Sequence, residues 1–498
     1  MKSSMLVTWR YLQDYSRRPI NLGLLILVPL IFVALAAGAV VDFARIVGGV
    51  DDASQLAAPT AGWAAAFLAG IAGFFHVIGS RDADLRLGAA GMGTGRVMVG
   101  RLASAGVLAV LASSTALGAL ALRTGIVDPG RVIAGTLMFA FTYLGIGAAV
   151  GTVVHNEVNG SLIMMFIWLV DVFQGPAMAG GDAWFTRLFP THFATLVMLD
   201  RPSGHAGPLR DLGWALVWAL GTVALAAWTY TAKARTSQSA AHVERGAWTR
   251  LSAGLKFGFK DYRRNAAMWV LLVVVPVFFI SLSFFVTPDQ PAPVELTDGR
   301  SVVTRIMSMI DVHGAIMVPI TIGFLAGLAG MFIVQGSIEA DARLVLAGFR
   351  TREILVSRLG VIAAAALLTT VVALAVTALD FAPENWAWFA VGNVAVAAIY
   401  GMVGVLVGIF FGRLGGLYVM FLLPFIDVGI AQNVMFSAAP PDWGGFLPAR
   451  GAVSILVDAA FTEGFDQERA LLLTVAWLIV LAVANGVAFT RIARPRRT

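Results

Sequence analysis

The sequence contains no cysteine, and charged side chains make up only 13% of its residues. The first absence excludes disulfides, thiol nucleophiles and thiolate metal sites. Soluble domains carry roughly 25% charged residues, so the second absence argues against a soluble globular protein. The chain has no GxxxxGK[ST] phosphate-binding loop, and its six histidines include no pair at HExxH spacing. The sequence therefore shows no ATP site of that type and no metalloenzyme pattern.

Long uncharged runs dominate the chain, and 58% of its residues are hydrophobic. A helix of about 20 apolar residues crosses the ~30 Å hydrocarbon core of a bilayer. We therefore predict an all-α polytopic membrane protein with about twelve transmembrane helices. The predicted spans are 20–41, 62–79, 102–122, 132–153, 159–178, 213–231, 267–286, 314–335, 359–379, 387–411, 416–436 and 470–490.

The charges between these spans are distributed unevenly. With the N-terminus inside, the inner segments hold 25 of the 35 Lys and Arg residues but only 9 of the 29 acidic ones. Cytoplasmic loops carry an excess of Lys and Arg in membrane proteins. The distribution therefore predicts a multi-pass protein with both termini in the cytoplasm.

The second half of the chain repeats the first. Residues 79–102 and 336–359 are identical at 12 of 24 positions, without a gap, at an offset of 257. Hydrophobic composition alone would match Leu and Val, whereas here a polar skeleton is shared. We predict two parallel six-span repeats, with a first half at 1–231, a cytoplasmic linker at 232–247 and a second half at 248–498. Matched pairs include Ser80/Ser337, Asp84/Asp341, Arg86/Arg343, Gly91/Gly348 and Arg101/Arg358.

Two matched carboxylates, Asp171 and Asp427, fall inside the fifth span of each half. A carboxylate at that depth is costly, so it should face the bundle interior and have a partner or take up a proton. One interpretation is a site for a cationic or hydrogen-bonding substrate, or a gate. The other is a carboxyl group satisfied by a neighbouring span or by the outer segment that follows. Both stay open at this point.

Each half also has an opening segment and an outer segment that are not spans. Trp9 and Tyr15 share a helical face opposite Arg10, and the stretch from Trp248 to Tyr262 is similarly amphipathic, which favours an interfacial elbow helix. The outer connections 179–212 and 437–469 contain apolar stretches too short to cross the bilayer, and these are predicted to be re-entrant or interfacial.

Together these features resemble the permease subunit of an ABC-2 type exporter, of the type V architecture. The resemblance rests on the interfacial helix before span one, the polar connection between spans two and three, and the re-entrant outer segment between spans five and six. It covers nearly the whole chain, twice. The fused double-length permeases of actinobacterial antibiotic and multidrug exporters are the most similar members.

The resemblance implies a mechanism and partners. The second–third connections would be coupling helices that dock into two separate ATPase subunits, which bind ATP and Mg, so this chain would be no enzyme and hold no cofactor. The cargo would be a hydrophobic or amphipathic molecule, leaving through the bacterial inner membrane among its lipids; no nucleic acid is involved. The implied coupling residues are Asp82, Asp84, Arg86, Glu339, Asp341 and Arg343. The predicted pathway or gate residues are Asp171, Asp427, Pro29 and Pro276.

Two other classes of membrane protein fit the sequence less well. A proton-coupled secondary transporter of the major-facilitator type also has two parallel six-span halves. Its characteristic G-x-x-x-D-R-x-G-R signature after span two is not matched by the residues from Gly79 to Arg86. An intramembrane enzyme is disfavoured because no paired His, Cys or clustered acidic motif occurs.

Overall fold

The computed structural model describes most of the chain. The described residues are 2–17, 19–46, 53–80, 83, 94–177, 184–199, 208–233, 266–287, 289–298, 301–346, 351–436 and 438–492. The chain falls into two compact units, Met1–His242 and Val243–Thr498, and each is described by itself below.

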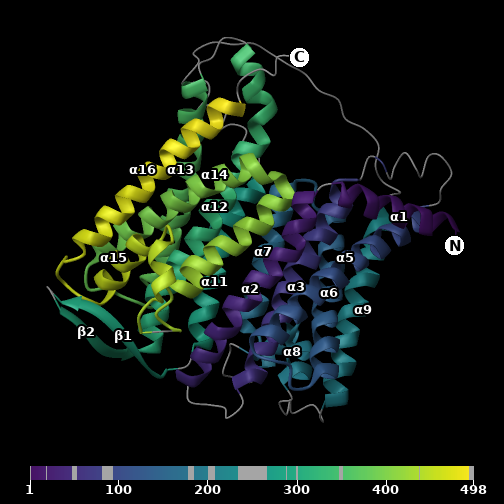
Figure 1. Cartoon of the computed structure of the whole chain (residues 1–498), viewed down its shortest axis with the longest axis horizontal. Helices are drawn as coiled ribbons and strands as arrows, with labels where there is room; N and C mark the ends of the chain where they lie inside the picture. Colours follow the sequence, from purple (N-terminus) through teal and green to yellow (C-terminus); the bar gives the residue numbers. More distant parts are fainter. Residues whose placement is uncertain are drawn as a thin grey trace. The chain divides into compact units, whose positions relative to one another are not determined.

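Unit 1 is helical throughout its described residues (Figure 1). Each of the six spans predicted for the first half lies on one of its long helices. The elements are α1 Lys2–Ser16, α2 Pro19–Ile46, α3 Ala53–Ile78, α5 Thr94–Arg123, α6 Pro129–Val153, α7 Glu157–Gln174, the 3₁₀ turn η1 Trp184–Leu188, α8 His192–Leu199 and α9 Pro208–Lys233.

Unit 2 has a similar series of long helices and, in addition, a two-stranded antiparallel hairpin where no strand was predicted. Its elements are α11 Ala266–Val286, β1 Pro291–Asp298, β2 Ser301–Ser308, α12 Met309–Leu346, α13 Thr351–Thr377, α14 Trp386–Pro424, the π-helical turn η2 Phe425–Ala431, the 3₁₀ turn η3 Asp442–Phe446, α15 Arg450–Phe461 and α16 Glu468–Ile492.

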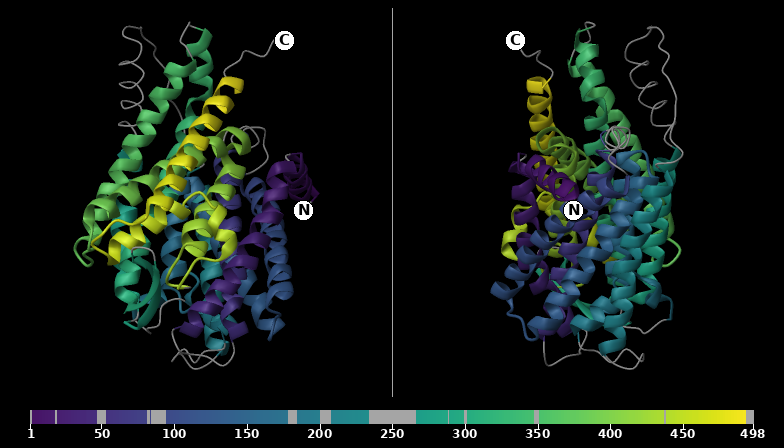
Figure 2. Two further views of the ribbon diagram at one scale, coloured as in Figure 1. Left: turned by 60° about the vertical axis from the view of Figure 1, so that its left-hand side comes forward. Right: turned by 90° about the vertical axis from the view of Figure 1, so that its right-hand side faces the viewer.

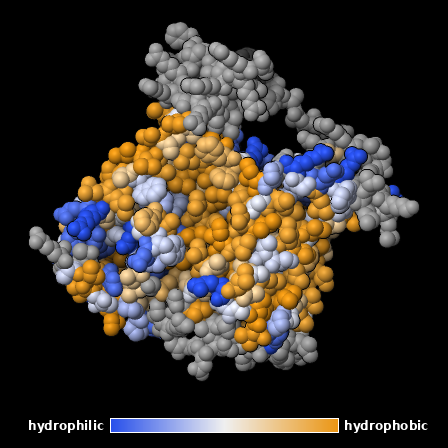
Figure 3. Space-filling model, in the orientation of Figure 1, coloured by the Kyte–Doolittle hydropathy of each residue, from blue (hydrophilic) through white to orange (hydrophobic). Residues whose placement is uncertain are grey.

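The all-α polytopic fold is confirmed. Among the described residues, nine helices are long and apolar enough to cross a membrane, and hydrophobic side chains cover much of the visible helical surface (Figure 3). One of the nine, Trp386–Ala431, contains the span predicted at 387–411 and most of the span predicted at 416–436. Gly412 interrupts it with a positive φ of 67°, a conformation that glycine adopts without steric cost. The count of twelve spans and the repeat architecture stay predictions.

A glycine seam joins the second and fourth predicted spans in both units. In unit 1 a Cβ atom at Gly147 of α6 would overlap the carbonyl oxygen of Gly70 in α3. In unit 2 a Cβ atom at Gly404 of α14 would overlap the carbonyl oxygen of Gly327 in α12. Apolar helices gain no hydrophobic driving force from one another in lipid, so close backbone approach at small residues holds them together. All four glycines fit the offset of 257.

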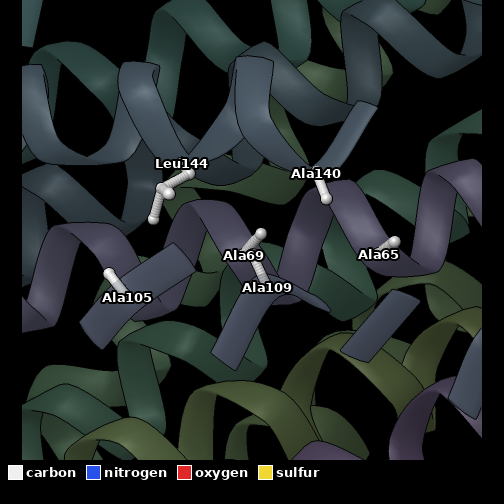
Figure 4. Close-up of a cluster of buried hydrophobic side chains, with 6 residues drawn as sticks. All are labelled: Ala65, Ala69, Ala105, Ala109, Ala140 and Leu144. Atoms are coloured by element: carbon white, nitrogen blue, oxygen red, sulfur yellow. The ribbon is translucent and has the colours of Figure 1, made fainter. Parts of the chain in front are cut away.

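Small side chains extend this packing to a third helix in unit 1. Alanines of α3, α5 and α6 form a buried cluster with one leucine (Figure 4). Because each alanine adds a single methyl group, the three helices can approach closely at this cluster. The cluster consists of Ala65, Ala69, Ala105, Ala109, Ala140 and Leu144.

The predicted outer segments fold as short helices. Each consists of a 3₁₀ turn, a Pro-containing bend and a helix, α8 with 8 residues or α15 with 12. At 1.5 Å per residue these helices are about 12 and 18 Å long, which is too short to cross a ~30 Å core. Every residue of α8 is buried, which is typical of a segment folded back into the protein. In unit 2, β1 is tied to the same region by the Glu295 N–H, which donates to the Ala438 carbonyl at 3.0 Å.

The amphipathic opening of unit 1 forms a helix as expected. α1 lies across the ends of α2 and α5 and contacts both (Figures 1 and 2). Trp9 remains 67% exposed, while Thr8 donates to the Gly100 carbonyl at 3.2 Å. The second predicted amphipathic segment, 248–262, lies outside the described residues.

Candidate functional site

The buried carboxylate of unit 1 holds the outer segment to the helix bundle. Asp171, near the end of α7, is 1% exposed. Its Oδ2 accepts a hydrogen bond from the Tyr143 hydroxyl of α6 at 2.8 Å. Its Oδ1 accepts one from the backbone N–H of Thr191, just before α8, at 3.2 Å. The carboxylate therefore joins three elements that are far apart in sequence.

Unit 2 contains the same arrangement with a different use of the two oxygens. Asp427, in the π-helical turn η2, is also 1% exposed. Its Oδ2 accepts hydrogen bonds from the Tyr400 hydroxyl at 2.8 Å and from the Ala449 N–H, just before α15, at 2.8 Å. Its Oδ1 is buried without a hydrogen-bond partner. π-helical turns occur frequently at functional sites.

We call each set of three groups the carboxylate clamp: Asp171, Tyr143 and the Thr191 amide in unit 1, and Asp427, Tyr400 and the Ala449 amide in unit 2. Hydrogen bonds to a charged acceptor stabilise by about 1.5–3 kcal/mol each. The amide comes from the N-terminal side of a helix, where a negative charge is additionally favourable. Each clamp therefore fixes the start of the short outer helix against the fourth and fifth predicted spans. A pathway or gate role for the two carboxylates stays a prediction.

The two predicted prolines lie inside helices. Pro29 is buried in α2 and Pro276 is buried in α11. A proline inside a helix removes one backbone hydrogen bond and crowds the preceding turn. Both positions are therefore local weak points of the first span of each unit, and their part in transport stays a prediction.

The predicted coupling residues are only partly described. Asp82, Asp84 and Arg86 lie outside the described residues. In unit 2 the backbone of α12 continues through Glu339, Asp341 and Arg343 to Leu346, and α13 begins at Thr351. The connection between the spans predicted at 314–335 and 359–379 is therefore largely helical, whereas the sequence predicted a polar connection of about 20 residues there.

The helical extension in unit 2 has a definite length. α12 runs 11 residues beyond the predicted span end at 335, which corresponds to about 16 Å of helix. In unit 1, α5 begins at Thr94, the position that matches Thr351. Both third spans thus start at the same position of the repeat.

A cluster missed from the sequence ties α1 to the bundle in unit 1. The guanidinium carbon of Arg101 lies 4.2 Å from the centroid of the Tyr11 ring, and Arg101 Nη1 donates to the His76 carbonyl at 3.0 Å. The His76 ring meets the Tyr11 ring edge-on, and its Nε2 lies 2.7 Å from the Ser104 hydroxyl. His76 is therefore a packed histidine. Arg101 was visible only as a matched position of the repeat.

Within the described ranges, no group of three His, Cys, Asp or Glu residues is arranged to hold a metal ion. Some described polar groups of the bundle hold helices together, as in the two clamps, whereas both oxygens of Asp211 and both ring nitrogens of His313 are buried without a hydrogen-bond partner.

Comparison with known proteins locates the family pattern. Residues 85–228 match the model of the ABC-2 family transporter proteins. The match begins in the first second–third connection and ends within α9, so it includes Tyr143, Asp171 and Thr191 of the first clamp. No curated protein matches the chain. The chain is a multi-pass membrane protein, and this match supports an ABC-2 type transporter permease, with residues 85–228 as the region that carries the family pattern.

Proposed function

We propose that this chain is the transmembrane subunit of an ATP-driven exporter that moves a hydrophobic or amphipathic molecule out of the cytoplasm or the inner leaflet. The observation that carries the proposal is the ABC-2 match over residues 85–228. ABC-2 membrane domains are transport subunits that work with ATPases, so ATP and Mg belong to separate subunits. No observation favours a proton-coupled transporter.

Coupling to the ATPases is assigned to the two connections after span two. In unit 2 the apolar part of α12, which is long enough to cross a membrane, ends at Ser337. The acidic and Arg positions at 339–343 follow on the same helix. A rigid helical arm transmits a push at its tip to the span that it continues. The shared skeleton of Asp84/Asp341 and Arg86/Arg343 supports one ATPase contact for each unit.

α1 supports the same assignment in unit 1. Arg101 follows the first connection by a few residues on α5 and is stacked on Tyr11 of α1. A cation lying over an aromatic ring contributes about 0.5–2 kcal/mol. Movement of the connection would therefore be passed to α1 through this contact as well as to α5 itself.

The nature of the cargo follows from the spans. Charged residues are rare in the described helices, and the carboxylates of Asp171 and Asp427 each accept hydrogen bonds within a clamp. A strongly charged hydrophilic cargo would lack partners in such a bundle. A hydrophobic or amphipathic cargo suits it better.

The proposal is tested by reconstitution. The chain is purified alone and with its genomically adjacent ATPase, and ATP hydrolysis and transport are measured in proteoliposomes. We expect transport only when both proteins and ATP are present, with hydrolysis stimulated by substrate. Transport by the chain alone, driven by a proton gradient, would overturn the proposal.

The coupling surface has its own test. Asp84→Arg and Asp341→Arg together should abolish co-purification of the ATPase while membrane insertion stays normal. Asp380→Arg is the matched control, because Asp380 is exposed and lies on a predicted outer connection of unit 2. Unchanged co-purification of the double variant would show that the ATPases dock elsewhere.

A further inference from the structure

Unit 2 contains a cavity of about 330 Å³ between β1, α15 and the segment that follows η2. It lies beside the outer segment, at the end of the unit where the clamp holds α15. Its walls are apolar in part, through Leu296, Val434, Val453 and Val457. A positive and a negative side chain, Arg450 and Asp458, line it at separate places, and this arrangement indicates a ligand that carries both charges.

The positive group is Arg450, the first residue of α15. Its Nη1 donates to Gln432 Oε1 at 3.2 Å, and Gln432 is held in place by its own Nε2, which donates to the Gly444 carbonyl at 2.8 Å. No ion pair involves this half-buried guanidinium within the part of the chain that the structure describes. Burial lowers the pKa of Arg450 from its usual value, which shows that its charge is held at a cost.

The negative group is Asp458, in the last turn of the same helix. It is 3% exposed; its Oδ2 accepts a hydrogen bond from the Thr462 hydroxyl at 3.1 Å, and its Oδ1 is buried with no hydrogen-bond partner, although the side chains of Gln467 and Asp466 also interact with the carboxyl group. Burial, together with the neighbouring Asp466, raises the pKa of Asp458 to about 6. A buried carboxylate oxygen without a donor is costly, and an amino group in the cavity would satisfy it.

The two charges are arranged against the preference of the helix. A helix favours anionic side chains in its first turn and cationic ones in its last, whereas α15 has Arg450 at its start and Asp458 near its end. Eight residues separate them, which is about 12 Å along a helix. Departures from such local rules concentrate at functional sites. Between the two charges the lining is Val453, Ser454 and Val457.

Unit 1 differs at a matching position that the structure describes, while Asp200, which matches Asp458 at the offset of 258, lies outside the described residues. The position that matches Arg450 at the offset of 258 is His192, which is 4% exposed. α2 ends at Ile46 and α3 begins at Ala53, so six residues connect them where unit 2 has a hairpin of 18 residues from Pro291 to Ser308. The cavity therefore belongs to the second copy and to the hairpin that covers it.

We propose that this cavity binds an amphipathic zwitterion, with its anionic group on Arg450 and its amino group on Asp458, the apolar body lying between them. Glu295 is a further acidic residue in the lining. The proposal deepens the proposed function, on which its place in an export pathway rests, by naming a class of cargo. Binding itself requires neither ATP nor an ATPase.

The test uses the purified full-length chain in nanodiscs without an ATPase. Binding of ω-aminooctanoic acid, octanoic acid and octylamine is measured by calorimetry on the wild type, Arg450→Gln, Asp458→Asn and Glu463→Gln. Glu463 is an exposed acid on the same outer segment that does not line the cavity. We expect the zwitterion to bind best and to lose at least about tenfold in affinity in each cavity variant, since each removes one charge-assisted contact.

Octanoic acid and octylamine, which carry one charge each, show which side chain binds which end of the zwitterion. Octanoic acid should weaken only with Arg450→Gln, and octylamine only with Asp458→Asn, while Glu463→Gln binds all three as the wild type does. Thermal unfolding checks that the variants fold, and Arg450→Lys is the second variant if Arg450→Gln does not. Equal zwitterion affinity in all variants, or no binding to the wild type, would overturn the proposal. Loss of ATP-driven transport with binding intact would instead count against the proposed function.

Discussion

In each unit a buried carboxylate, a tyrosine hydroxyl and a backbone amide hold the short outer helix to the bundle, but the hydrogen bonds among these three groups differ between the units. In unit 1 each oxygen of Asp171 accepts one hydrogen bond, whereas in unit 2 both donors reach Oδ2 of Asp427 and Oδ1 has none. Asp171 lies in a regular α-helix and Asp427 in a π-helical turn. Both units therefore anchor the outer helix in the same way, but substitutions of the clamp aspartate should cost different amounts of stability in the two units.

The glycine seam should give the largest effect, and an equal one in both units. Gly147→Val and Gly404→Val each place a side chain where a backbone carbonyl of the facing helix lies. Overpacking costs about 1–3 kcal/mol in an adaptable core and more against backbone, so we expect each variant to lose about 3 kcal/mol or to fail to fold. Thermal unfolding in detergent measures this.

The control for the seam is Gly221→Val in α9, where an added Cβ atom meets nothing within 4 Å. It should unfold close to the wild-type temperature. A large difference between Gly147→Val and Gly404→Val would show that the two seams are not equivalent.

The clamps should respond unequally to the loss of charge. Asn at position 171 must point its amide nitrogen at one of two donors, so one hydrogen bond is lost at a cost of about 1–3 kcal/mol. Asn at position 427 can place its oxygen where Oδ2 accepts both bonds, and it also removes a buried charge. Asp171→Asn should therefore destabilise more than Asp427→Asn, as measured by thermal unfolding of each full-length variant.

Tyr143→Phe and Tyr400→Phe serve as the matched pair for this prediction. Each removes one donor of a clamp and leaves the carboxylate in place, so both should cost a similar amount. Equal losses for the two Asn variants, together with unequal losses for the two Phe variants, would contradict the assigned geometry.

The smallest effect is expected at the contact of α1 with α5. Arg101→Lys keeps the charge but loses the planar stacking on Tyr11, which contributes about 0.5–1 kcal/mol. Hydrogen exchange of the α1 amides should accelerate several-fold, while exchange in α6 stays unchanged. Unchanged exchange in α1 would show that other contacts hold this helix.

The sequence predicted the helices better than their contacts. Hydrophobic runs placed all twelve predicted spans on helices, and the break near residue 412 follows from a glycine between two apolar runs. Asp171 and Asp427 were singled out because carboxylates are rare in spans. Their partners were not, because Tyr143 lies 28 residues from Asp171 and an aromatic residue in a span gives no sign of what its hydroxyl meets. Aligning Tyr143 with Tyr400 at the offset of 257 was the available signal.

The hairpin and its cavity were missed for a different reason. The stretch from Pro291 to Ser308 was treated as an outer loop, although Gly299-Arg300 between two runs rich in β-branched residues is a signal for a two-residue hairpin turn. The helical arm of α12 was also underestimated, because the hydropathy of a span ends where charges begin, while the helix itself does not.

We propose that one copy of this chain docks two ATPase subunits, one on each half. Native mass spectrometry of the complex purified with its ATPase tests it most directly. We predict one copy of this chain with two ATPase subunits, falling to one ATPase when either Asp84→Arg or Asp341→Arg is introduced alone. A complex with two copies of this chain, or loss of both ATPases from a single substitution, would contradict the claim.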